Sequence, residues 1–186
     1  MTIIAAYRNK NGVAIACDSQ GTSNDTKQYY GSKMVKRRNW VCGVAWSYRV
    51  MDLIQECEEL DFDITSIKDV RLFRDILKKE VIENAGGETM AASQKTIMHP
   101  VAIIIINNKG NIYSIEDDYQ IHNIEKYYAI GSGRDIALGA LFASDEYYAK
   151  DVGIIFIKDF VKVSVEAACR HNTGCGGKIH VASFQK

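Results

Sequence analysis

The sequence predicts an α+β fold in which pairs of helices cover a largely antiparallel sheet on each side. Segments with strand patterns and segments with helix patterns come in separate blocks, in the order strands, two helices, strands, two helices and a last strand. Such blocks favour a layered α+β domain over an alternating parallel fold. Neighbouring strands are joined by short polar turns, which are typical of hairpins. The chain has 186 residues, of which 47% are hydrophobic, so we expect one domain over residues 1–186.

The first 46 residues predict two strand pairs. Thr2–Arg8 and Val13–Asp18 are mostly apolar runs separated by a turn rich in asparagine and glycine, which indicates a hairpin. The polar stretch 19–32 is predicted to be a loop that delivers Lys33 to the sheet. Lys33–Arg37 and Trp40–Trp46 are then predicted to form the second pair.

Two helices follow. Apolar residues recur at helical spacing over Tyr48–Leu60, with acidic residues on the opposite face. The second helix is predicted to begin at a cap formed by Thr65 or Ser66 and to end at Gly86-Gly87.

The second half of the chain repeats this order of strands and then helices. Its strands and helices are predicted at Val101–Ile106, Asn111–Ile115, Tyr127–Ile130, Asp135–Phe142, Asp151–His171 and Lys178–Phe184.

Charge and hydropathy exclude several classes of function. Lysine plus arginine and aspartate plus glutamate both number 23, so no general attraction to nucleic acid is expected. The longest apolar runs, Val101–Ile106 and Gly153–Ile157, are far shorter than the roughly 20 residues of a membrane span. No export signal is expected at the start of the chain. The five cysteines are irregularly spaced and predict reduced thiols in the cytoplasm.

Thr2 is the first candidate for chemistry because it directly follows the initiator methionine. Methionine is generally removed when the next residue is small, so we expect a mature chain that begins with Thr2. The Thr2 hydroxyl would attack a carbonyl group. The α-amine of the same residue, with a reference pKa of about 7.7–8.0, would accept the hydroxyl proton.

Asp18 and Lys33 are the charged residues that we expect beside Thr2. Asp18 ends the strand predicted to pair with that of Thr2, and Lys33 lies 15 residues further on. A buried carboxylate there would orient the lysine, and a nearby ammonium lowers the pKa of an amine or a hydroxyl by repulsion of like charges.

These segments resemble the start of proteasome β-type subunits, and in particular the peptidase subunit of the bacterial two-component ATP-dependent protease. The resemblance is carried by Met1-Thr2-Ile3-Ile4-Ala5, by Ile15-Ala16-Cys17-Asp18-Ser19-Gln20 and by Gly31-Ser32-Lys33-Met34-Val35. It continues at Gly131-Ser132-Gly133, and at Asn172 and Cys175-Gly176-Gly177, so it spans nearly the whole chain.

The resemblance implies an N-terminal-nucleophile (Ntn) hydrolase with a four-layer αββα sandwich. Thr2, Asp18, Lys33 and Ser132 would be the catalytic residues of a threonine-type endopeptidase, with Ser132 supporting the amine and the nucleophilic water. No cofactor or metal is implied. The substrate would be a peptide or an unfolded protein. The partners would be further copies of the chain in a homo-oligomeric ring and an ATP-dependent unfoldase.

Three positions depart from the family pattern. Where the family has an Ala-Gly-Gly run whose first glycine holds the oxyanion, this chain has Trp46 and Ser47. We expect the Trp46 backbone N–H to take that place and the indole to reshape the substrate cleft. Asn172 and Cys175, in supporting positions, replace an acid and a hydroxyl.

These departures leave two alternatives open. One is a catalytically inactive structural subunit with the same fold. The other is an Ntn amidase that acts on a small amide. Zinc is not expected, because Cys169, His171 and Cys175 lack a clear fourth ligand apart from the distant His180.

Overall fold

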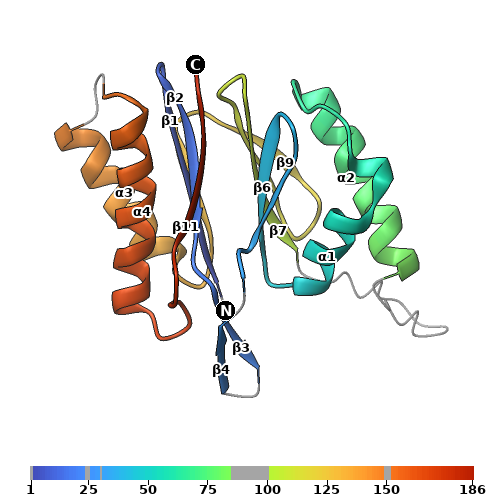
Figure 1. The fold of residues 1–186 in the computed structure, drawn as a ribbon, viewed down its shortest axis with the longest axis horizontal. Helices are drawn as coiled ribbons and strands as arrows, with labels where there is room; N and C mark the ends of the chain where they lie inside the picture. Colours follow the sequence, from blue (N-terminus) through green and yellow to red (C-terminus); the bar gives the residue numbers. More distant parts are fainter. Residues whose placement is uncertain (1, 24–25, 30, 85–100, 149–151) are drawn as a thin grey trace.

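Two antiparallel sheets lie face to face in the computed structural model, and a pair of helices covers the outer face of each (Figure 1). The structure describes residues 2–23, 26–29, 31–84, 101–148 and 152–186. The four-stranded sheet has the order β10 (Tyr127–Gly131), β1 (Ile3–Asn9), β2 (Gly12–Cys17), β11 (His180–Gln185). The five-stranded sheet has the order β5 (Met34–Lys36), β6 (Trp40–Ala45), β7 (Ala102–Asn107), β8 (Ile112–Ile115), β9 (Ile121–Ile124).

The helices form the two outer layers. α3 (Arg134–Tyr148) and α4 (Ile154–His171) pack on the four-stranded sheet, while α1 (Tyr48–Glu56) and α2 (Ile67–Asn84) pack on the five-stranded sheet (Figure 1). The predicted α+β class and the four-layer αββα order are therefore confirmed.

Strand periodicity explains why both faces of each sheet are apolar. On β1, the side chains of Ile3, Ala5 and Tyr7 pack toward α3 and α4, whereas Ile4 and Ala6 pack between the two sheets. Successive side chains of a strand point to opposite faces, so a continuous apolar run supplies two layers at once. The molecule consequently has three apolar layers, one under each helix pair and one between the sheets.

The main difference from the predicted elements lies in residues 19–32, which were expected to be a loop. The structure has a two-stranded hairpin there, formed by β3 (Gln20–Ser23) and β4 (Thr26–Tyr29), which projects beyond the sandwich (Figure 1). Its residues are polar, so the sequence gives no apolar alternation to detect. The hairpin is defined by the backbone pairing of β3 with β4.

Smaller differences concern the ends of elements. The predicted helix Tyr48–Leu60 ends at Glu56 and is followed by a short 3-10 turn at Glu58–Leu60. β9 was not predicted, and α3 extends to Tyr148 instead of Phe142. The predicted helix stop at Gly86-Gly87 lies outside the described residues. Within the part of the chain that the structure describes, no helix combines the length and the apolar character needed to cross a membrane.

Candidate active site

Thr2 lies at the entry to β1 and is almost fully buried, with 5% of its surface exposed. Its carbonyl oxygen accepts hydrogen bonds from the Ser132 hydroxyl at 3.4 Å and from the Gly133 N–H at 3.5 Å. Gly131 has φ +98°, and a Cβ at this position would collide with the Thr2 carbonyl oxygen. Only glycine therefore allows the end of β10 to approach Thr2 this closely.

Asp18 is fully buried just after β2, where three donors hold its carboxylate. Oδ1 accepts hydrogen bonds from the Ile3 N–H at 3.1 Å and from Lys33 Nζ at 2.6 Å, and Oδ2 accepts one from the Gly176 N–H at 3.0 Å. The Asp18 N–H in turn donates to the Ile3 carbonyl at 3.2 Å. Asp18 thus joins the start of β1, the start of β5 and the loop before β11.

Lys33 forms a buried ion pair with Asp18. Its side chain is 2% exposed, and Nζ also donates to the Gln20 carbonyl at 2.5 Å. The Lys33 carbonyl accepts the Val44 N–H at 3.0 Å, which fixes the backbone of Lys33 against the end of β6. Removing two such charges from water is costly unless their remaining polar atoms are satisfied, and here both partners have further hydrogen bonds.

Ser132, Asn172 and Cys175 form a second group beside Thr2. The Ser132 hydroxyl lies 3.6 Å from the Cys175 sulfur, and Asn172 Nδ2 donates to the Ser132 carbonyl at 2.7 Å. Asn172 Oδ1 accepts the Gly174 N–H at 2.8 Å, so its amide connects the end of α4 to the turn between β10 and α3. Burial raises the pKa of the Cys175 thiol. Cys175 is therefore a neutral neighbour of Ser132 at neutral pH and a poor nucleophile.

A small cleft of about 90 Å³ opens next to these residues. Thr2 and Lys33 line it together with Val44 at the end of β6. The other lining residues are Trp46 and Ser47, which precede α1, and Tyr48 and Met51 in its first turn. The Ser47 side chain is already engaged as the N-cap of α1, because its hydroxyl accepts the Val50 N–H at 3.2 Å. This hydroxyl is therefore engaged as an acceptor, and it keeps one hydrogen to donate.

Trp46 has an unusual backbone. Its φ is +80°, in the left-handed region that bulky residues rarely adopt, and its side chain is 53% exposed. Strain of this kind costs on the order of 1–3 kcal/mol and tends to occur at functional sites. Trp46 lines the cleft, which we expected its indole to reshape.

The structure thus gathers the residues singled out from the sequence at one end of the sandwich. The contacts that sequence reasoning missed come mainly from backbone groups, namely the Gln20 carbonyl on Lys33 and the Gly176 N–H on Asp18. Backbone donors and acceptors have no side-chain signature. Tyr48 and Met51 were also missed as lining residues. In the described part of the chain, no three His, Cys, Asp or Glu side chains are grouped to hold a metal ion.

Comparison with solved structures finds several proteins with a similar fold. BPH from Thiobacillus denitrificans is 18% identical, with a TM-score of 0.80 over 99% of this chain and 98% of BPH; its complex with Epoxomicin gives a TM-score of 0.79. Eukaryotic HslV from Trypanosoma brucei is 17% identical, with a TM-score of 0.69 over 100% of both chains. The Gly-1 mutant of Anbu from Hyphomicrobium sp. strain MC1 is 15% identical, with a TM-score of 0.75 over 100% of this chain and 82% of Anbu.

At these identities the likeness establishes the fold. This structural likeness agrees with the resemblance of the sequence to proteasome β-type subunits. Neither a protein-family profile nor a curated protein sequence matches the chain.

Proposed function

We propose that this chain is a threonine-type peptidase subunit in which Thr2 becomes the N-terminal nucleophile after loss of Met1. The observation that carries the proposal is the buried Asp18–Lys33 pair, at 2.6 Å, whose lysine lines the same small cleft as Thr2. An attacking hydroxyl, a fixed ammonium and a carboxylate that holds the ammonium in place are the parts that this chemistry needs.

The reaction would proceed in two steps. In the first, Thr2 Oγ attacks the peptide carbonyl, the free α-amine takes the hydroxyl proton, and the amine product leaves with that proton to give an ester on Oγ. In the second, water attacks the ester, which releases the acid and restores the Thr2 hydroxyl. The Lys33 ammonium favours the neutral form of the amine by repulsion of like charges. The Trp46 N–H is the proposed oxyanion donor.

The test begins with the intact mass of the purified native protein, which shows whether Met1 is absent. Incubation with epoxomicin, a peptide epoxyketone whose reaction needs both a hydroxyl and a free amine, should then add one inhibitor mass to the processed chain. Thr2→Ala should abolish this labelling, whereas Thr2→Ser, which keeps the hydroxyl, should retain it. A processed wild-type chain that neither reacts nor cleaves an unfolded protein would contradict the proposal and favour the inactive structural subunit.

The size of the cleft favours one other candidate, an Ntn amidase. A volume of about 90 Å³ beside a half-exposed indole fits a small acyl group better than a long peptide side chain. Hydrolysis of small amides without cleavage of unfolded protein would support this reading. Cleavage of both substrate types would favour the peptidase.

We also propose that the subunits assemble into a ring and work with an ATP-dependent unfoldase. The support for assembly is a group of exposed apolar side chains on the outer helix layer of α3 and α4. Its members are Phe142, Tyr147, Tyr148, Ile155, Phe156 and Val163, each at least half exposed. Exposed apolar groups of this kind commonly mark interaction surfaces.

A further inference from the structure

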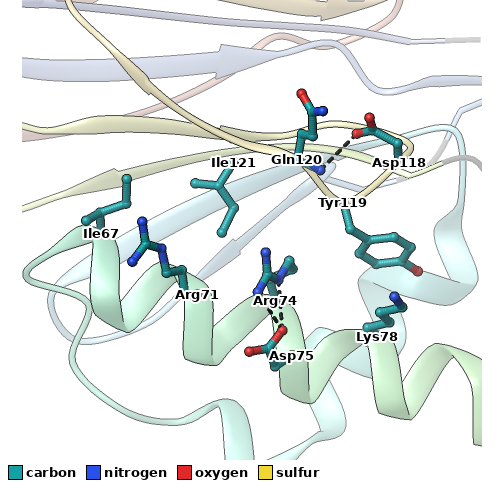
Figure 2. Close-up of a pocket in the computed structure, with 9 residues that line it drawn as sticks. All are labelled: Ile67, Arg71, Arg74, Asp75, Lys78, Asp118, Tyr119, Gln120 and Ile121. Atoms are coloured by element: carbon teal, nitrogen blue, oxygen red, sulfur yellow. Dashed lines mark hydrogen bonds and ion pairs between the residues drawn. The ribbon is translucent and has the colours of Figure 1, made fainter.

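A second hollow lies between α2 and the connection from β8 to β9, and it shares no lining residue with the Thr2 cleft. It is an open groove of about 520 Å³ (Figure 2). Three cationic side chains from α2 form one wall, and the residues from Asp118 to Ile121 form the other. The chemistry of this groove is therefore unrelated to the proposed nucleophile.

The cationic residues form a row along one side of α2. Arg71, Arg74 and Lys78 are three and four residues apart, which places them on the same helical face. At 1.5 Å of rise per residue, the row is about 10.5 Å long. Figure 2 shows Arg71 below Ile121 and Lys78 below the ring of Tyr119, with Arg74 between them.

The positive charge of this row is only partly neutralised. Arg74 pairs with Asp75 at 2.8 Å, but within the described residues neither Arg71 nor Lys78 forms an ion pair. The carboxylate on the opposite wall, that of Asp118, accepts the Gln120 N–H at 2.8 Å and points away from α2 (Figure 2). The two ends of the row are thus open to an external anion.

The opposite wall is strained. Tyr119 has φ +65° although it is bulky and only 6% exposed, and Lys78 Nζ lies 5.6 Å from the centroid of its ring. Residues held in the left-handed region tend to mark ligand sites. Immediately after Tyr119 and Gln120 the chain enters β9, the last strand of its sheet. Within the described residues β9 pairs only with β8, so its other edge presents unpaired backbone groups.

We propose that this groove binds an extended acidic peptide segment. The carboxylates of the peptide contact Arg71 and Lys78, and its backbone pairs with the open edge of β9. A compact anion would engage only one end of a row this long, whereas an extended peptide reaches both. An exposed sheet edge also recognises a peptide backbone specifically, because the added segment extends the sheet. The proposal goes beyond the proposed function and requires no cleavage.

The probe is a fluorescein-labelled hexaglutamate peptide, titrated with the full chain and followed by fluorescence anisotropy at low ionic strength. Saturable binding is expected for the wild type. The double variant Arg71→Gln/Lys78→Gln should weaken it about tenfold or more, because charge-assisted contacts at both ends of the row are lost. Lys68→Gln/Lys79→Gln is the matched control, since it removes the same charge from exposed positions of α2 that do not line the groove.

Two outcomes of this titration would overturn the proposal. One is the absence of saturable binding to the wild type. The other is equal weakening by the two double variants, which would mean that net charge alone attracts the peptide. Thermal melts of both variants separate a loss of binding from a loss of folding.

A second arm tests the pairing with β9. Hexaglutamate with alternate amides N-methylated keeps its carboxylates but cannot donate from those positions to a strand edge. Its affinity should fall severalfold if the backbone pairs with β9. Equal affinity for the two peptides would overturn the peptide assignment.

Discussion

At the scale of single residues, the buried pair of Asp18 and Lys33 has the largest energetic consequence. Both side chains are withdrawn from water and held by further hydrogen bonds. Loss of one partner leaves the other charge buried without compensation, which costs more than the pair itself contributes. The same interaction therefore affects folding as well as the proposed chemistry.

We expect Lys33→Met to lower the free energy of unfolding by about 3–5 kcal/mol, because the Asp18 carboxylate is then buried without a counter-ion. The double variant Asp18→Asn/Lys33→Met should recover part of this loss. Urea unfolding followed by circular dichroism measures both. If the double variant were less stable than Lys33→Met by the full cost of Asp18→Asn alone, the two side chains would not be coupled.

Trp46 permits a second prediction at this scale. Trp46→Gly removes the left-handed strain of about 1–2 kcal/mol but adds about 0.5–1 kcal/mol of backbone entropy cost. The net effect on stability is therefore expected to be a gain of up to about 1.5 kcal/mol. Trp46→Ala is the control, because it removes the indole but keeps a Cβ at φ +80°. Thermal unfolding should rank glycine above alanine, and the reverse order would contradict the strain argument.

The candidate site was predictable where side chains form it. Thr2, Asp18, Lys33 and Ser132 could be singled out because their order and spacing resemble a known pattern. Two features could not be predicted from residue types. The backbone carbonyl of Gln20 has no sequence signature, and the positive φ of Trp46 runs against the preference of a tryptophan residue.

At the scale of elements, the start of α2 shows how a local pattern determines a boundary. The sequence suggested Thr65 or Ser66 as the cap. The structure has the Asp69 carboxylate accepting the backbone N–H groups of both residues, at 2.9 Å from Thr65 and 2.8 Å from Ser66. The acid at the third helical position thus satisfies donors that precede the helix, as in a capping box.

Asp69→Ala should lower the free energy of unfolding by about 1 kcal/mol, and Asp69→Asn, which keeps one acceptor oxygen, by less.

Although burial acts to raise the pKa of Asp69, the hydrogen bonds from Thr65 and Ser66 outweigh it and lower the pKa below its ordinary value. A carboxyl group whose pKa is lower in the folded than in the unfolded state stabilises the fold when the pH is above the unfolded-state pKa. This contribution is lost as the pH falls through the folded-state pKa, because the carboxylate is then protonated. The difference in melting temperature between wild type and Asp69→Ala should therefore be largest near neutral pH and should decrease below about pH 4. A difference that is independent of pH would contradict the role of the carboxylate.

The elements that the sequence did not reveal share one property. β3, β4 and β9 are four residues long, and apart from the two end isoleucines of β9 they are polar or contain glycine. Short polar strands lack the alternation on which strand prediction depends. The long apolar strands and the amphipathic helices were found because each must bury a face.

At the scale of the whole molecule, the two outer helix layers differ in how many apolar side chains they expose to solvent. α4 presents Ile155 and Phe156 at 70% and 56% exposure, and α2 presents Leu72 and Ile82 at 52% and 54%. Among the described residues, six large apolar side chains are exposed on α3 and α4, whereas two are exposed on α2. A concentrated apolar surface gains more from burial by a neighbouring subunit than isolated side chains do.

This distribution leads to a prediction about assembly. Light scattering should find a particle of many subunits for the wild type, and Ile155→Lys/Phe156→Lys should shift it toward smaller species, because buried apolar contact is replaced by two charges that would have to lose their hydration. Leu72→Lys/Ile82→Lys introduces the same charge on the other helix layer and should leave the particle mass unchanged. A monomeric wild type would remove the ring from the proposed function, whereas equal dissociation by both double variants would assign the contact to both helix layers. Because all four positions lie outside the Thr2 cleft, epoxomicin labelling of the dissociated species would then show whether a subunit needs its neighbours to react.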